Sequence, residues 1–368
     1  MMKLAVVAGE ASGDLHASEV VRELKKLAPG LTSFGIGGDL LAREGTLLLK
    51  HASEMGIVGL FNVIRHLPMF RRAFSDLIAR IEAERPDAVL LVDYPDFNLR
   101  VARRCKELGL RVIYYISPQL WAWRSGRVRH IARYVDHMLV IFPFEEEFYR
   151  KHDVPVTYVG HPLVEQLSGV RRSERKLDRL RIALLPGSRR HEVETLLPPM
   201  LEAVQILRRE RDVEPYLIQA PTIEHDYLEA IMKQAGVDVP ILPHDGGEGV
   251  AAADVALSSS GTATLEAALL GTPVVVMYRL SRATYLLARR LVKLPHFSLV
   301  NIVAGKRVVP ELIQGDVNGA RIAEEVRTLV EPAHYDHVRA ELLAIREKLG
   351  EPGTAERAAR VVHEMMTT

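Results

Sequence analysis

The feature that most constrains the fold is an alternation of short apolar runs with longer amphipathic stretches, and this alternation occurs twice along the 368 residues. Short runs rich in Val, Ile and Leu predict buried strands, and the stretches between them have helical spacing. The predicted strands lie at 4–8, 88–92, 112–116 and 138–142, and then at 182–185, 216–219, 255–257 and 273–277. Strands that alternate with helices predict parallel sheets of the α/β class.

A charged segment without an apolar face, SGVRRSERKLDRLR, separates the two sets of strands and is expected to be a linker. The chain is also longer than one ordinary domain. We therefore expect two Rossmann-like, doubly wound domains, at residues 1–168 and 180–349. Beyond about residue 317 the chain is expected to be mostly helical, with a terminal helix at about 350–368 that packs back onto the first domain.

Composition excludes several classes of function. Lys and Arg (48) almost balance Asp and Glu (47), so the net charge gives no sign of a nucleic-acid partner. The single cysteine, Cys105, excludes internal disulfides, and its helical surroundings favour a core residue over a nucleophile. The apolar run of MMKLAVVAGEASGD is too short for a signal peptide, and no window reaches the length of a membrane span. We expect a cytosolic protein, or one on the cytosolic face of a membrane.

Polar turns follow the predicted strands, and in open α/β sheets ligands bind at the carboxyl ends of strands. The motif GEASGD follows the first strand: Gly9 and Gly13 permit a tight backbone, and Glu10, Ser12 and Asp14 offer polar contacts or helix caps. It matches neither the dinucleotide fingerprint nor the Walker motif. Ligand contact and helix capping both stay open for this turn.

The motif VDYPDFN places Asp93 and Asp96 directly after an apolar strand. A carboxylate that is partly desolvated at the mouth of a cleft can have a raised pKa and act as a general base toward a hydroxyl. We favour this role for Asp93. The alternatives are a helix cap or an ion pair with Arg100 or Arg103.

Two turns of the second half are candidates for phosphate binding. LLPGSRRHEV offers Gly187, Ser188 and Arg189, and an arginine there could hold a phosphate through several donors. SSSGTATLEAALLG places a polar turn before a helix that is predicted over 262–270, so free N–H groups and the positive end of the helix dipole would face the ligand. Exposed arginines and an ordinary helix cap are the alternatives.

Three further stretches mix apolar and cationic residues. Trp121 and Trp123 lie near several arginines, but two tryptophans make a weak platform for nucleic acid, so we favour local structure or pocket walls. The stretches 59–74 and 281–301 have a composition that suits a membrane interface as well as ordinary packing. The expected interfacial patch consists of Leu60, Phe61, Arg65, Met69, Phe70, Arg71 and Arg72.

The order of these motifs resembles the lipid-A-disaccharide synthase family. The likeness rests on GEASGD, VDYPDFN, SPQLWAWR, GHPL, LLPGSRRHEV, SSGTATLEAALLGTPVVVMYR and SLVNIVAG, which together span most of the chain. The resemblance implies a GT-B glycosyltransferase whose two Rossmann-like domains enclose an interdomain cleft. It also implies inverting transfer from UDP-2,3-diacylglucosamine to 2,3-diacylglucosamine 1-phosphate (lipid X), which forms a β(1→6) link in lipid A biosynthesis and releases UDP.

The resemblance also implies roles for single residues. Asp93 would deprotonate the acceptor 6-hydroxyl, Arg189 would stabilise the leaving diphosphate, Asn301 of SLVNIVAG would position a substrate, and Glu266 would bind the ribose hydroxyls. The diphosphate would lie on the turn formed by Ser259, Ser260, Gly261 and Thr262. No cofactor is implied, and the absence of a D-x-D motif agrees with a metal-free arrangement.

The first domain would then hold lipid X and face the membrane, and the second would hold the UDP-sugar. The expected partners are these two substrates and the inner-membrane surface, without nucleic acid, and a homodimer stays open. The expected location is cytoplasmic, with peripheral association to the inner membrane. The main alternative is another GT-B enzyme that uses UDP-N-acetylglucosamine, either a 2-epimerase or a transferase with a polyprenyl-linked acceptor. GEASGD and WAWR argue against these alternatives. A non-catalytic nucleotide-sugar or nucleic-acid binding module is the third hypothesis, and the candidate acid, base and phosphate-binding groups at several strand ends argue against it.

Overall fold

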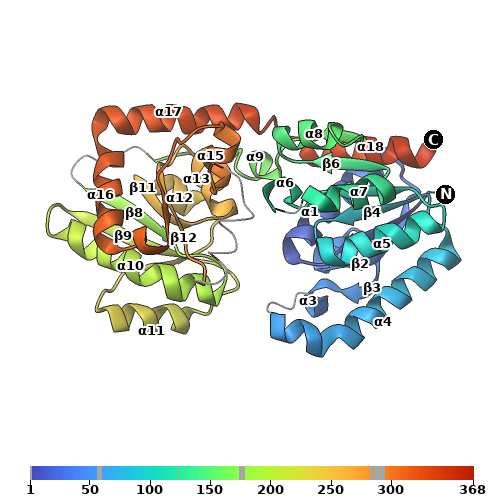
Figure 1. Cartoon of the computed structure of the whole chain (residues 1–368), viewed down its shortest axis with the longest axis horizontal. Helices are drawn as coiled ribbons and strands as arrows, with labels where there is room; N and C mark the ends of the chain where they lie inside the picture. Colours follow the sequence, from blue (N-terminus) through green and yellow to red (C-terminus); the bar gives the residue numbers. More distant parts are fainter. Residues whose placement is uncertain (1, 56–59, 124, 174–178, 282–284, 286–294) are drawn as a thin grey trace. The chain divides into compact units, whose positions relative to one another are not determined.

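The computed structural model describes residues 2–55, 60–123, 125–173, 179–281, 285 and 295–368. Contacts divide the chain into two compact units, of which one is Met1–Pro162 together with Glu351–Thr368 and the other is Leu163–Gly350 (Figure 1). The first unit therefore contains both ends of the chain. In the described part of the chain, no helix is both long enough and apolar enough to cross a membrane.

The first unit contains a sheet of seven parallel strands in the order β3-β2-β1-β4-β5-β6-β7. Since β2 and β3 lie on one side of β1 and the later strands on the other, the order reverses between β1 and β4, and the turns after these two strands diverge there. The strands are β1 (Lys3–Ala8), β2 (Thr32–Gly37), β3 (Leu47–His51), β4 (Ala88–Val92), β5 (Val112–Tyr115), β6 (His137–Val140) and β7 (Val156–Tyr158).

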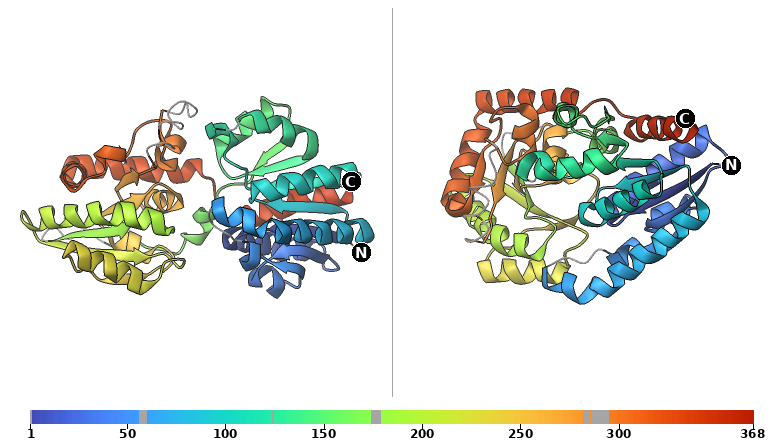
Figure 2. Two further views of the ribbon diagram at one scale, coloured as in Figure 1. Left: turned by 60° about the horizontal axis from the view of Figure 1, so that its bottom comes forward. Right: turned by 45° about the vertical axis from the view of Figure 1, so that its right-hand side comes forward.

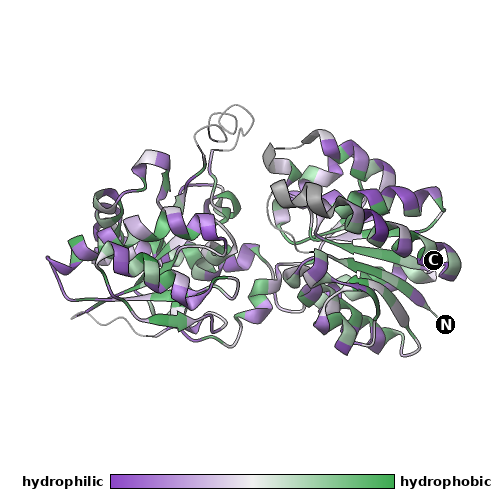
Figure 3. Ribbon diagram, turned by 90° about the horizontal axis from the view of Figure 1, so that it is seen from below, coloured by the Kyte–Doolittle hydropathy of each residue, from purple (hydrophilic) through white to green (hydrophobic). Residues whose placement is uncertain are grey.

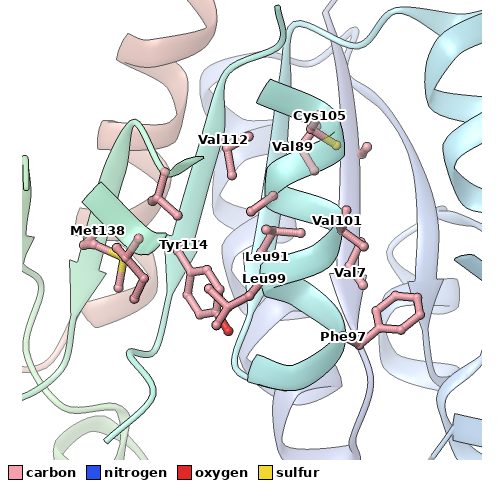
Figure 4. Close-up of a cluster of buried hydrophobic side chains, with 14 of the residues drawn as sticks. Val7, Val89, Leu91, Phe97, Leu99, Val101, Cys105, Val112, Tyr114 and Met138 are labelled. Atoms are coloured by element: carbon pink, nitrogen blue, oxygen red, sulfur yellow. The ribbon is translucent and has the colours of Figure 1, made fainter. Parts of the chain in front are cut away.

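Helices cover both faces of this sheet. Alternate residues of the strands pack against α4, α5 and α7, and Figure 4 shows α5 lying along β4 with Val101 and Cys105 turned toward the strands. On the other face α1 contacts β1, β4 and α18 (Figure 2). The helices are α1 (Ala11–Leu27), α2 (Asp39–Arg43), α3 (Ala52–Met55), α4 (Leu60–Glu84), α5 (Pro95–Glu107), α6 (Leu120–Trp123), η1 (Ser125–Arg127), α7 (Val128–Tyr134), α8 (Pro143–Arg150), α9 (Pro162–Gln166, at the boundary of the units) and α18 (Thr354–Thr367).

The second unit repeats the arrangement with six parallel strands in the order β10-β9-β8-β11-β12-β13, so its order reverses between β8 and β11. Its strands are β8 (Leu180–Leu185), β9 (Val213–Gln219), β10 (Ile241–Pro243), β11 (Val255–Ser259), β12 (Val274–Tyr278) and β13 (Glu311–Ile313). Its helices are α10 (Arg190–Arg208), α11 (His225–Ala235), α12 (Glu248–Ala252), α13 (Thr262–Leu269), α15 (Leu299–Ala304), η2 (Gln314–Asp316), α16 (Gly319–Val330) and α17 (Pro332–Lys348).

Two doubly wound sheets are what the alternation in the sequence predicts, and this prediction is confirmed. Figure 3 shows strands that are mostly hydrophobic and helices that mix hydrophobic and hydrophilic residues, as expected of strands buried on both faces. The helical character of the chain beyond residue 317 is confirmed by α16, α17 and α18.

The described part of the charged segment expected as a linker is tied to the second unit by Arg172. Its guanidinium donates to the hydroxyls of Thr272 and Tyr335, both at 2.5 Å, and to the carbonyl of Ala253 at 3.0 Å. Burial lowers the pKa of Arg172. These contacts attach Arg172 to the second unit, which begins at Leu163, before this segment.

Candidate active site

A pocket of about 500 Å³ lies in the second unit at the carboxyl ends of its strands. It forms where the turns after β8 and β11 diverge, which is where ligands of open α/β sheets bind. Eight residues predicted from the sequence as site residues line it, namely Gly187, Ser188, Arg189, Ser259, Ser260, Gly261, Thr262 and Glu266.

The N-terminus of α13 faces this pocket. Ser259 is the last residue of β11, and the N–H of Ser260 donates to the carbonyl of Met277 at 2.9 Å, which fixes the start of the turn. A Cβ on Gly261 would meet no atom within 4 Å, so the turn is open on that side. No described side chain caps α13. The N–H of Thr264 donates to the carbonyl of Gly261 at 3.1 Å, which leaves the N–H groups of Thr262 and Ala263 and the helix dipole available to an anion.

The turn before α10 contributes Gly187, Ser188 and Arg189. Gly187 has φ 120°, and a Cβ there would lie 2.4 Å from Oε2 of Glu192, so only glycine suits this position. Oε2 of Glu192 accepts the N–H of Ser188 at 3.2 Å, and Oε1 accepts Nη1 of Arg189 at 3.1 Å. The Arg189 side chain is 69% exposed, and its ion pair with Glu192 is the only one it forms among the described residues. The guanidinium can therefore reorient toward a ligand.

Glu266, on the second turn of α13, is a nearly buried carboxylate with little compensation. The residue is 7% exposed, and among the described side chains its nearest cationic partner is His244, whose Nε2 lies 3.9 Å from Oε2. This distance suits an ion pair but is too long for a hydrogen bond. A carboxylate in this state can accept hydrogen bonds from hydroxyls of a ligand.

Sequence reasoning missed two ionisable residues of the pocket, Glu192 and His244. Glu192 lies within the quoted motif LLPGSRRHEV, where its spacing of four residues from Ser188 indicates that it can cap the helix. His244 follows β10, a three-residue edge strand that the apolar pattern did not reveal. No local signal in the sequence marks it.

Asn301 lies on α15, is fully buried and does not line the pocket. Its Oδ1 accepts the N–H groups of Val308 and Val309, at 2.7 and 3.0 Å, and its Nδ2 donates to the carbonyl of Val309 at 2.9 Å. These bonds occupy the amide, so the contacts favour a role in fixing the loop after α15 over direct contact with a substrate.

In the first unit, Asp93 follows β4 in an unusual backbone conformation. Asp93 and Tyr94 both have positive φ, at 48° and 51°, which non-glycine residues adopt rarely and mostly where the surrounding structure enforces it. The carbonyl of Asp93 accepts the Tyr114 hydroxyl at 2.6 Å and Nδ2 of Asn98 at 2.8 Å, and its N–H donates to Tyr115 at 3.0 Å. The fold therefore holds this residue by its backbone and leaves its side chain available.

Burial raises the pKa of the Asp93 carboxyl to about 6, and the charge of Glu10 adds to the effect, while the Tyr94 N–H and His16 oppose it. A carboxyl with this pKa is mostly ionised near neutral pH and is a stronger base than an ordinary aspartate. These are the properties that a general base toward a hydroxyl needs.

The GEASGD motif is partly helical, because α1 begins at Ala11 and includes Ser12, Gly13 and Asp14. Asp14 is buried, and its carboxylate accepts the N–H groups of Gly38, Leu40 and Leu41 at 2.6 to 3.2 Å. Asp14 thus caps α2 rather than its own helix. Gly9 is required because a Cβ there would lie 2.4 Å from the Tyr94 ring, and Ser12 is exposed.

The remaining candidates have structural partners. Asp96 is exposed and pairs with Arg127 at 2.9 Å, rather than with Arg100 or Arg103, which were the alternative partners considered from the sequence. Trp121 donates to Oε1 of the buried Glu145 at 3.1 Å, a carboxylate whose pKa burial raises to about 7. Cys105 lies in the core of the first unit, where burial raises its thiol pKa to about 12. The Trp123 side chain and Arg124 lie outside the described residues.

Two doubly wound parallel sheets, the second with an uncapped helix N-terminus at its switch point, define a GT-B protein, the class that includes glycosyltransferases and nucleotide-sugar epimerases. Solved structures share the architecture. A putative UDP-N-acetylglucosamine 2-epimerase from Listeria monocytogenes is 14% identical with a TM-score of 0.65, covering 98% of this chain and 95% of that one. MurG from Acinetobacter baumannii is 14% identical with a TM-score of 0.59, covering 99% of each chain.

Within this class the chain belongs to the lipid-A-disaccharide synthetase family, whose model matches residues 4–363. The lipid-A-disaccharide synthase of Geobacter sulfurreducens is 43% identical over 99% of this chain and 97% of its own. That of Myxococcus xanthus is 44% identical with the same coverage. The chain is accordingly a glycosyltransferase.

Proposed function

We propose that the chain transfers 2,3-diacylglucosamine from its UDP derivative to the 6-hydroxyl of 2,3-diacylglucosamine 1-phosphate, with inversion at the anomeric carbon. The observation that carries this proposal is the pocket of the second unit, where an uncapped helix terminus lies near a poorly compensated carboxylate. An anion site beside a hydroxyl acceptor fits the diphosphate and ribose of UDP. Family membership supports the identity of the sugars.

In this proposal the diphosphate lies on the N-terminus of α13 and is also held by Arg189, while both ribose hydroxyls donate to Glu266. Negative charge grows on the leaving diphosphate as its bond to the anomeric carbon breaks. The helix terminus and the arginine therefore stabilise the transition state more than the ground state. Gly187 and Ser188 shape the turn that presents Arg189.

Asp93 is proposed as the general base. Its carboxylate takes the proton of the acceptor 6-hydroxyl, the hydroxyl oxygen attacks the anomeric carbon, and UDP leaves with the bonding electron pair. Gly9, Ser12, Gly13 and Asp14 are proposed to build the acceptor side: Gly9 admits close packing of the Tyr94 ring and Asp14 fixes α2. Asn301 is proposed to act through the loop that it holds.

We also propose association with an anionic membrane surface through α4. Of the expected patch, Arg71 and Arg72 are exposed and Met69 is half-buried, whereas Phe70 packs against the core. The side chains of Leu60, Phe61 and Arg65 lie outside the part of the chain that the structure describes. Most residues of the stretch 281–301 also lie outside it. Co-sedimentation with anionic vesicles that weakens at high salt would support this role, and equal recovery with neutral vesicles would exclude it.

The reaction is tested directly by incubating the purified protein with UDP-2,3-diacylglucosamine and lipid X and identifying the products by mass spectrometry. We expect a tetra-acylated disaccharide 1-phosphate and UDP. An epimerised sugar from UDP-N-acetylglucosamine, without disaccharide, would favour the 2-epimerase alternative. The homodimer considered from the sequence stays a prediction, which the mass of the protein in solution would test.

The donor site is tested by Glu266→Ala. Loss of two charge-assisted hydrogen bonds should weaken UDP binding roughly thirtyfold to a thousandfold. The native protein should also bind UDP more tightly than 2′-deoxy-UDP, and the variant should lose this discrimination. Calorimetric titration beside a thermal melt measures both effects. Unchanged UDP affinity with a lower melting temperature would show that Glu266 is structural.

A further inference from the structure

His244 and Glu266 face each other in the lining of the pocket, from different elements. His244 follows β10 and has a side chain that is 43% exposed, while the Glu266 side chain, on α13, is 9% exposed. Their 3.9 Å separation joins Nε2 of the imidazole to Oε2 of the carboxylate. The imidazole can therefore exchange protons with solvent while it touches a nearly buried anion.

The other oxygen of Glu266 has a different neighbour. A Cβ on Gly247 would lie 3.4 Å from Oε1, so the backbone at Gly247 borders that oxygen. The N–H of Gly247 does not donate to Oε1 of Glu266, because this N–H donates to Oδ1 of Asp245 at 3.2 Å. In the part of the chain that the structure describes, His244 is thus the one cation within ion-pair distance of Glu266.

We propose that His244 is a positioning residue for nucleotide binding, whose imidazolium holds the Glu266 carboxylate in the orientation that both ribose hydroxyls need. This inference rests on the proposed function, because it takes Glu266 as the ribose acceptor. A carboxylate offers about four lone-pair sites, so it can accept from two ribose hydroxyls while the imidazolium stays beside it at ion-pair distance. Binding does not require His244 to leave.

The charges around His244 set the expected pH dependence. Interaction with Glu266 raises the pKa of His244 above its ordinary 6.5, the charge of Asp245 adds to this, and burial opposes it. Among the remaining lining residues, Arg189 and Glu192 form an ion pair with each other. The positioning contact is complete while His244 is protonated, and nucleotide affinity therefore falls as the pH rises from 6.5 through the raised pKa.

The test compares the native protein with His244→Gln, which keeps a donor but cannot be protonated, by calorimetric titration with UDP at about pH 6 and about pH 8.5. At a given pH, UDP has the same ionisation state in the titration of the native protein and in that of the variant. The ratio of their UDP affinities therefore reports only the change in the protein. At the lower pH we expect the native protein to bind UDP about threefold to tenfold more tightly than His244→Gln does. At the higher pH the two proteins should bind UDP almost equally. A ratio that does not change with pH would overturn the proposal.

A matched control is His225→Gln. His225 forms an ion pair with Glu229 on α11, at 3.4 Å, and does not line the pocket. This variant should bind UDP as the native protein does at both pH values. If Glu266→Ala abolishes tight binding and His244→Gln has no pH-dependent effect, the inference fails and the proposed function stands. If Glu266→Ala leaves UDP affinity intact, the proposed function itself fails.

Discussion

Four carboxylates that are buried or nearly buried illustrate two kinds of environment. Asp14 is buried with three backbone donors, and Asp254 is buried against Arg181 at 3.0 Å, as stable interiors require. Asp93 and Glu266 are held with much less compensation. The sequence places Asp14 and Asp93 equally well after strands. It could not separate them, because the donors to Asp14 come from residues 38–41, which only the tertiary fold brings there.

Asp93→Asn should separate catalysis from stability. The amide keeps the size of the side chain and suits the left-handed backbone, but it cannot act as a base, so turnover should fall roughly 10²- to 10⁴-fold with UDP affinity retained. In the native protein turnover should fall as the pH drops through about 6, the pKa of Asp93. Steady-state rates across pH measure both effects, and near-normal turnover in the variant would remove Asp93 from the mechanism.

The same substitution should stabilise the first unit. The folded pKa of about 6 lies above the ordinary 3.8, so the ionised form is the less favourable one in the folded state. The contribution of Asp93 to the free energy of unfolding is therefore most favourable below about pH 4. It falls by on the order of 2 to 3 kcal/mol as the pH rises through 6. Asp93→Asn should recover this at neutral pH in a thermal melt. Asp96→Asn, at an exposed ion pair, is the control and should change neither stability nor turnover appreciably.

At the level of elements, the strands predicted from the sequence are the buried central ones. β1, β4, β5, β6, β8, β9, β11 and β12 were all expected, because continuous Val, Ile and Leu runs are typical of strands covered on both faces. The strands missed are β7, β10 and β13, of three residues each, and β2 and β3. The edge strands β7, β10 and β13 present too few residues for a pattern, and β2 contains two glycines in six residues.

A glycine in β2 explains why its sequence looks unlike a strand. Gly35 has φ 153°, and a Cβ there would lie 1.8 Å from the carbonyl oxygen of Val6 in β1. The clash is with backbone, so no rotamer relieves it. Gly35→Ala should cost about 3 kcal/mol or more of the first unit's stability. Gly169→Ala, where a Cβ meets nothing within 4 Å, is the control, and equal melting temperatures for both variants would contradict the argument.

For the whole molecule, the decisive feature is that the first unit is completed by the last residues of the chain. α18 contacts α1 and β4, Arg357 donates to the carbonyl of Val159 at 2.8 Å, and Arg111 donates to that of Met365 at 2.5 Å. The second unit, by contrast, is continuous in sequence. The two units should therefore respond differently to the loss of residues 351–368.

Truncation after Gly350 should destabilise the first unit and spare the second. It removes the buried apolar face of α18, which includes Val362 and Met366, and uncovers its partners on α1. We expect a lower thermal transition and rapid proteolysis within 1–162, with UDP affinity retained by 163–350. Calorimetry, proteolysis mapped by mass spectrometry, and titration measure the three effects. A single unchanged transition would show that α18 is dispensable.

The position of α18 also has a consequence for how this protein folds while it is synthesised on the ribosome. The strands of the first unit emerge first, but the helix that covers α1 and β4 is made only after all of Leu163–Gly350. At ordinary elongation rates this interval lasts roughly 10 to 40 s. During that time the uncompleted face of the nascent chain is exposed to chaperones, while the second unit can fold as soon as its own residues are free.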